Sequence, residues 1–106
     1  MDKEKTKTLL TRRVQKLAKD NGFSYNRVFI RNQRTMWGSC SSKNNISLNM
    51  KLTELPNKLS NYVILHELVH IYKKDHSKPF WAEMYRLAGN GKKMASRLKK
   101  YRTGLY

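Results

Sequence analysis

Apolar residues recur at helical intervals in two regions of the chain, one near each end. In the N-terminal region the pattern ends at Asn21-Gly22, a pair typical of a helix C-cap. In the C-terminal region an apolar stripe spans residues 80–88, and Gly89-Asn90-Gly91 separates it from a last, basic helix. The apolar positions of these three predicted helices are Leu9, Leu10, Val14, Leu17 and Ala18; Phe80, Trp81, Met84, Tyr85, Leu87 and Ala88; and Met94, Leu98 and Tyr101.

Three short apolar segments between these helices predict strands at residues 27–31, 35–40 and 46–50. The polar residues 41–45, between the second and third segments, predict a hairpin turn. One helix followed by three strands and then further helices favours an α+β domain with a small, mainly antiparallel three-stranded sheet. At 106 residues the chain fits a single domain, residues 1–106.

A fourth helix is predicted over residues 57–73, directly after Pro56, because proline is common near the first turn of a helix. Its middle, Tyr62-Val63-Ile64-Leu65, is apolar on every side, which is typical of a buried helix. We therefore expect the sheet to pack on this central helix, with the other helices flanking it.

All three histidines of the chain lie in this helix or directly after it. His66-Glu67-Leu68-Val69-His70 places two imidazoles four residues apart, on one helical face, where they can bind one metal ion together. Glu67 is placed to take a proton from a water molecule that the metal activates. The alternative is a pair of core histidines bonded to backbone, but a buried His–Glu–His set needs partners, and zinc supplies them.

A catalytic zinc usually has three protein ligands and one open position, so a third ligand is expected. His76 follows His66 by ten residues, as in the longer metzincin motif, although Lys73 stands where that motif has glycine. Glu83, on the following predicted helix, is the other candidate. The sequence favours His76 as the third ligand and leaves Glu83 open.

The segment Trp37-Gly38-Ser39-Cys40 lies on the second predicted strand. Glycine within a strand marks a bulge or a close approach of the backbone. Two interpretations are equally supported. The segment packs as an ordinary hairpin strand, or it is an edge strand on which Trp37, Gly38, Ser39 and Cys40 bind an extended substrate backbone.

The net charge is +16, from 23 basic and 7 acidic residues. Such a charge attracts polyanions such as nucleic acid or an anionic membrane surface, although it can also be a solvated basic face that keeps a small protein soluble. No apolar run approaches the roughly 20 residues of a membrane span. The single cysteine and the charged start of the chain favour a cytoplasmic location.

The chain resembles the YgjP-like zinc metallopeptidases and, more broadly, the small zincins called minigluzincins, with SprT-like and WLM proteases as more distant relatives. The matching blocks are Val28-Phe29-Ile30-Arg31, Trp37-Gly38-Ser39-Cys40-Ser41, Ile46-Ser47-Leu48-Asn49, Leu55-Pro56, Tyr62-Val63-Ile64, His66-Glu67-Leu68-Val69-His70 and His76-Ser77-x-x-Phe80-Trp81. They occur in order and cover most of the chain from about residue 21 to residue 101. The resemblance implies a three-stranded sheet over the active-site helix, zinc held by His66, His70 and His76, and Glu67 as the catalytic residue.

These observations predict a zinc-dependent endopeptidase acting on proteins or peptides. A second hypothesis, motivated by the charge, is a nucleic-acid-associated protein whose zinc site is structural or brings proteolysis to DNA-bound proteins. A third is a metal hydrolase that acts on a non-peptide bond.

Overall fold

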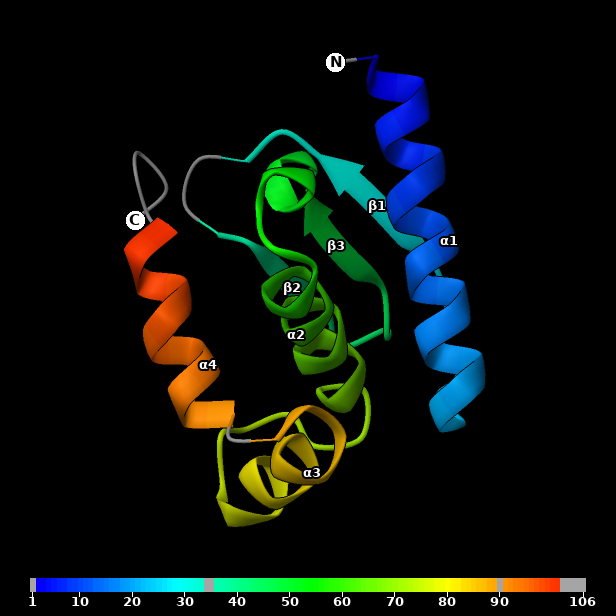
Figure 1. Cartoon of the computed structure of the whole chain (residues 1–106). Coiled ribbons are helices and arrows are strands. Elements are labelled where there is room, and N and C mark those ends of the chain that lie inside the picture. Colours follow the sequence, from blue (N-terminus) through cyan, green and yellow to red (C-terminus); the bar gives the residue numbers. More distant parts are fainter. Residues whose placement is uncertain (1, 34–35, 90, 102–106) are drawn as a thin grey trace.

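The computed structural model describes residues 2–33, 36–89 and 91–101 as a small α+β domain, which confirms the predicted fold class (Figure 1). Its helices and strands, in chain order, are α1 (Lys3–Asn21), β1 (Val28–Arg31), β2 (Gly38–Cys40), β3 (Ile46–Asn49), α2 (Asn57–Val69), α3 (Lys78–Ala88) and α4 (Gly91–Leu98). Short 3₁₀ turns, η1 (Met50–Glu54) and η2 (Lys99–Tyr101), follow β3 and α4.

Helix α1 is bounded by two caps that its sequence supplies. The Asp2 side chain accepts a hydrogen bond from the backbone N–H of Glu4, at 2.8 Å, at the N-terminal end. Gly22 adopts a left-handed conformation, with φ of 73°, at the C-terminal end predicted from the sequence. Leu10 and Val14 are fully buried, so one face of α1 belongs to the core.

The sheet is mixed, in the order β1-β3-β2. The β2–β3 pair is antiparallel, as the predicted hairpin requires, whereas β1 and β3 run parallel. The chain passes from β1 to the far edge of the sheet before returning through β3 in the middle, so β1 and β3 point the same way. The buried Asn49 secures this crossing, since its side-chain amide donates to the carbonyl oxygens of Gln33 and Met36.

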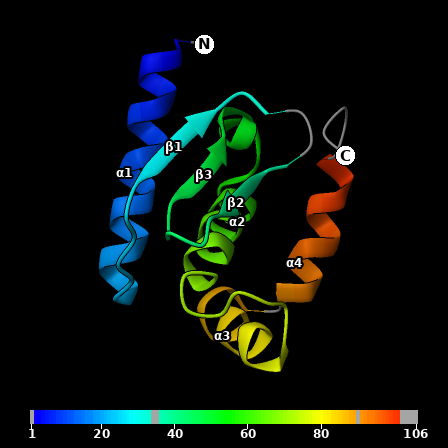
Figure 2. The ribbon, with the colours of Figure 1, turned by 180° about the vertical axis from the view of Figure 1, so that it is seen from behind.

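Helix α2 is the centre of the domain, as its all-round apolar sequence predicts. It packs against β2 and β3 and also contacts α1, α3 and α4. The two views show α1 on the β1 side of the sheet and α4 on the β2 side (Figures 1 and 2). The core is formed chiefly by Leu48, Leu59, Ile64, Leu68 and Phe80, each with no exposed surface.

The end of α2 differs from the prediction. The helix was expected to reach residue 73, but the α-helical segment ends at Val69. The N–H groups of Tyr72 and Lys73 both donate to the Val69 carbonyl at 3.0 Å, so the chain turns directly after the second histidine of the motif. This early turn allows the following loop to fold back over the helix.

Candidate metal centre

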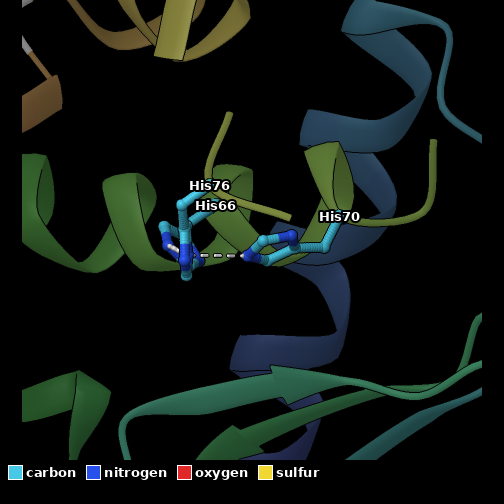
Figure 3. Close-up of side chains that lie close together, drawn as sticks. All are labelled: His66, His70 and His76. Atoms are coloured by element: carbon cyan, nitrogen blue, oxygen red, sulfur yellow. Dashed lines mark hydrogen bonds between the residues drawn. The ribbon is translucent and has the colours of Figure 1, made fainter. Parts of the chain in front are cut away.

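Three imidazoles converge at one end of α2. His66 projects from the last turn of α2 and His70 from its C-cap position, and His76 reaches them from the loop between α2 and α3 (Figure 3). The Nε2 atom of His76 lies 3.1 Å from Nε2 of His70 and 3.3 Å from Nε2 of His66. The three candidate ligand atoms all lie within 4.8 Å of one another. The structure therefore brings together the three histidines selected from the sequence.

These separations match the size of a tetrahedral zinc site. With Zn–N bonds of about 2.0–2.1 Å, two nitrogens on a tetrahedral ion lie about 3.3–3.4 Å apart. Three ring nitrogens facing one point cannot all satisfy one another, because each neutral imidazole has one donor nitrogen and one acceptor nitrogen. A cation bound at their lone pairs would satisfy all three, so the donor set fits a metal such as zinc.

Hydrogen bonds at the Nδ1 atoms of His66 and His70 determine which ring nitrogen of each is free to bind a metal. The Nδ1–H group of His70 donates to the carbonyl oxygen of Lys73 at 2.8 Å, and that of His66 faces the Glu67 carboxylate at 3.1 Å. Both protons are thereby held on Nδ1, which leaves the Nε2 lone pairs directed at the centre. Burial lowers the pKa of His70 below its ordinary value, and this favours the neutral form that a metal requires.

Phe80 packs its apolar ring against all three imidazoles of the cluster. Its ring centroid lies 5.0 Å from that of His66, 4.5 Å from that of His70 and 4.9 Å from that of His76. Phe80 is fully buried, as expected for a core residue. Trp81, on the same predicted apolar stripe, is half-buried and stacks on His76 with 5.9 Å between centroids. The first turn of α3 thus packs against the imidazoles and holds them in place.

Glu67 lies on the side of α2 that faces the sheet, and only 5% of it is exposed. The approach of β2 at this point is close. A Cβ atom added to Gly38 would lie 3.2 Å from Cγ of Glu67 and 3.1 Å from the Ser47 carbonyl oxygen. The close backbone approach predicted for Gly38 is therefore present, and it places β2 directly beside Glu67.

Glu83, the alternative third ligand, lies outside the histidine cluster. Its carboxylate pairs with Arg86 one turn further along α3. Among the described residues, the group that could hold a metal consists of His66, His70 and His76. The geometry thus favours the first of the two candidates that the sequence left open.

Strand β2 forms one edge of the sheet, since within the described part of the chain it pairs with β3 alone. The Trp37 carbonyl oxygen accepts from Asn49, and the Ser41 N–H donates to Asn45, so these two residues bond toward β3. Successive residues of a strand direct their N–H and C=O groups to opposite edges. Gly38 and Cys40 therefore present theirs at the open edge, where an extended chain could pair.

Lys74 connects the loop of His76 to the hairpin after β2. Its ammonium group donates to the Ser41 carbonyl oxygen at 3.2 Å and to the Asn44 side-chain oxygen at 2.8 Å. It also lies 4.0 Å from the sulfur of Cys40, a half-buried thiol whose pKa is raised by burial. Sequence reasoning missed this residue, because it stands in a basic run and its partners lie 30 and 33 positions away.

A pocket of about 180 Å³ opens beside the centre, between β2, α2 and α4. Its lining residues are Trp37, Gly38, Tyr62, Val63, His66, Glu67, Ala95 and Leu98. Tyr62, which sequence reasoning did not select, is almost fully buried, and burial together with the nearby Glu67 raises the pKa of its hydroxyl to about 12. That hydroxyl therefore stays protonated and can donate a hydrogen bond into the pocket.

Part of the positive charge lies on the outer face of α1. Lys5, Arg12 and Lys19 are exposed on the side of α1 opposite to the buried Leu10 and Val14. The predicted binding of nucleic acid to such a surface stays a prediction. In the described part of the chain, no helix is both long and apolar enough to cross a membrane.

Comparison with known proteins gives a consistent result. Residues 1–101 match the model of the YgjP-like metallopeptidase domain. The fold is similar to the crystal structure of the metallopeptidase zymogen abylysin from Pyrococcus abyssi, with a TM-score of 0.75 and 20% identity over 91% of this chain and 97% of that one. The zymogen of jannalysin from Methanocaldococcus jannaschii gives 0.73 and 19% over 87% and 95%. No curated protein matches the sequence significantly.

Proposed function

Because the chain belongs to the YgjP-like metallopeptidase family, we propose that it is a zinc-dependent endopeptidase acting on protein or peptide substrates. The observation that carries the proposal is the convergence of three imidazole nitrogens beside a buried carboxylate. The free thiol of Cys40 fits activity in a reducing compartment such as the cytoplasm.

In this proposal His66, His70 and His76 hold the metal through their Nε2 atoms. The Lys73 carbonyl and the Glu67 carboxylate keep the rings of His70 and His66 in the required tautomer. When bound, zinc would polarise the scissile carbonyl and lower the pKa of a water molecule at the open position.

Glu67 is the proposed general base. Its carboxylate would accept a proton from the attacking water and then deliver that proton to the leaving amine. Its low exposure supports this role, because a carboxylate shielded from bulk solvent interacts more strongly with nearby charge. Gly38 supports it too, since any larger residue would press against the Glu67 side chain.

Strand β2 is the proposed docking edge for the substrate backbone. Gly38 and Cys40 would exchange backbone hydrogen bonds with an extended peptide, while Trp37 and Ser39 bond toward β3 and hold the strand in place. Such pairing would lay the peptide alongside Glu67 and the three histidines.

The first test combines metal analysis with a carboxylate variant. Untagged protein should retain one zinc ion per chain after dialysis, and it should cleave an unfolded protein such as casein. Glu67→Gln should retain zinc but lose about 10²–10⁴-fold in turnover, the usual contribution of a general base. Glu83→Gln is the matched control, since Glu83 pairs with Arg86, and it should keep both zinc and activity. An active Glu67→Gln protein would refute the mechanism.

A second candidate function is association with nucleic acid, favoured by the net charge of +16 and the exposed cations of α1. Binding through phosphate contacts releases counterions, so affinity should fall steeply as salt concentration rises. Titration of labelled duplex and single-stranded DNA between about 50 and 200 mM salt tests this. No binding near physiological salt would remove the candidate.

A further inference from the structure

The face of the sheet that turns away from α2 carries no helix. Figure 2 shows β1, β3 and β2 in front of α2, and none of the described helices lies over them in this view. Alternate residues of a strand point to opposite faces. Val28 and Ile30 pack against the hydrophobic core, so Phe29 and Arg31 lie on the other face of β1. We call this uncovered side, with Phe29 and Arg31 on β1, the open face.

Arg27 continues the same pattern one residue before β1. Its carbonyl oxygen accepts a hydrogen bond from the Ile46 N–H at 2.8 Å, so it extends the pairing between β1 and β3. Arg27, Phe29 and Arg31 therefore form a row on the open face, with the aromatic ring between two guanidinium groups. The Arg31 guanidinium lies 5.0 Å from the centroid of the Phe29 ring. Both arginines are exposed and the ring is partly exposed, so all three can meet a ligand.

The positions beside Phe29 on the open face hold small side chains. Phe29 is in register with Ser47 of β3, and Ser47 is in register with Ser39 of β2. Residues directly opposite one another on neighbouring strands point to the same face. The row across the sheet is thus one aromatic ring followed by two serines. A flat group could lie next to the ring without meeting a large side chain.

The sheet region has no acidic residue that could neutralise these arginines locally. Residues 21–53, which include all three strands, contain no aspartate or glutamate. Among the described residues, no carboxylate forms an ion pair with Arg27 or Arg31. The planar guanidinium group matches the geometry of a phosphate and can donate two hydrogen bonds to it. The open face therefore combines an aromatic ring with two cations that are available to phosphates.

We infer that the open face binds single-stranded nucleic acid, with a base stacked on Phe29 and phosphates held by Arg27 and Arg31. Unpaired bases stack on aromatic side chains and on guanidinium planes, whereas the bases of a duplex are already stacked on one another. A ligand that offered charge alone would use the arginines and leave the ring without a partner. The inference does not depend on the proposed peptidase function, and it assigns the contact to a different surface from the outer face of α1.

The first experiment tests the ring. Fluorescence anisotropy measures binding of labelled oligo(dT) of about ten nucleotides to the untagged full chain. Phe29→Ala should weaken binding by about fivefold to a hundredfold, the usual range for loss of one stacked base, and Phe29→Trp should restore it. Tyr85→Ala is the matched control, because Tyr85 is an exposed aromatic residue on α3, and it should bind as wild type does. Equal affinity in wild type and Phe29→Ala would overturn the inference.

The second experiment tests the two arginines through the salt dependence of binding. Arg27→Gln and Arg31→Gln should each weaken binding and reduce the slope of log K against log salt concentration by about 0.7, the value for one phosphate contact on a single strand. Arg12→Gln is the matched control, since it removes an exposed arginine from the outer face of α1. A reduced slope in Arg12→Gln alone would place the contact on α1. That result would overturn the inference and leave the association with nucleic acid intact.

Two further measurements on the wild-type protein do not depend on how any variant folds. An abasic oligonucleotide of the same length should bind several-fold more weakly than oligo(dT), because it keeps the phosphates and lacks the bases. In ¹⁵N-labelled protein, oligo(dT) should shift the amide resonances of residues 27–31 and 45–47 more than those of α1. Equal binding of the two oligonucleotides, shifts confined to α1, or no binding at about 50 mM salt would each overturn the inference.

Discussion

The three imidazoles of the candidate metal centre come from two different kinds of structure. His66 lies on α2 and His70 directly follows it as the C-cap residue, and the backbone of this helix is hydrogen-bonded along its length and packed in the core. His76 lies on an exposed loop and is positioned by contacts with Phe80 and Trp81. We call His66 and His70 the helical half of the centre and His76 the loop half. The helical half is in place as soon as the domain folds, whereas the position of the loop half depends on local contacts and on the ion itself.

Removing a histidine ligand should give the largest effects on zinc affinity, and the loss should differ between the two halves. His70→Ala should abolish measurable zinc retention, because it removes a buried ligand together with its bond to the Lys73 carbonyl. His76→Ala should bind zinc weakly but detectably through the remaining helical pair. Competition with a chromophoric chelator measures both affinities. Wild-type affinity in His76→Ala, with loss of zinc in Glu83→Ala, would show that the loop half was assigned to the wrong residue.

Phe80→Ala should affect both halves together, because its ring contacts all three imidazoles. Truncating a fully buried phenylalanine typically costs about 3–5 kcal/mol of unfolding free energy. Urea denaturation of the metal-free protein measures this cost. Pro79→Ala is a suitable control, since Pro79 is the exposed neighbour on the same helix. A loss below 1 kcal/mol would mean that the ring does not support the cluster.

Gly38→Ala should disturb the helical half from the sheet side. The added Cβ would approach the Ser47 carbonyl oxygen and the Glu67 side chain at 3.1 and 3.2 Å, and backbone cannot yield easily. We expect overpacking to cost about 1–3 kcal/mol, with kcat reduced more than zinc affinity because Glu67 is displaced. Ser39→Ala on the same strand is the control. Unchanged kcat in Gly38→Ala would show that this close approach is not needed for catalysis.

Lys74→Ala should have the smallest effect and act on the loop half alone. Lys74 is exposed, so the stability change should stay below about 1 kcal/mol. Zinc affinity should nevertheless fall several-fold, because the loop loses its tie to Ser41 and Asn44. Lys74→Arg should restore part of the affinity, and Lys78→Ala, which changes an exposed lysine at the start of α3, should match wild type. Identical zinc affinities in wild type, Lys74→Ala and Lys74→Arg would show that the hydrogen bonds of Lys74 do not help to position the loop of His76.

The contrast between the two halves also explains what the sequence could predict. The spacing of His66 and His70 follows from helix geometry, so their shared face was predictable from local pattern alone. The end of α2 at Val69 was not, because it depends on hydrogen bonds made by Tyr72 and Lys73 outside the helical pattern. The convergence of His76 was expected from its position in the chain and from family resemblance, but the ring of Phe80 beneath it was not.

Longer-range features were harder still. The parallel pairing of β1 with β3 is set by a chain crossing that Asn49 secures, and neither has a periodic signature. The pocket beside Glu67 joins Trp37 to Leu98, residues about 60 positions apart. A sequence pattern predicts the structure of each segment separately, and it does not show which segments line the same pocket.

The compactness of the centre along the chain has a consequence for how zinc would stabilise this protein. His66, His70 and His76 span only eleven consecutive residues, so the unfolded chain keeps all three within reach of one ion. A ligand stabilises the native state only by its preference for that state, and binding to the unfolded chain reduces the effect. Added zinc should therefore raise the melting temperature by less than the shift calculated from its affinity for the native state alone. The ion would order the region around α2 and α3 more than it would hold the whole domain together.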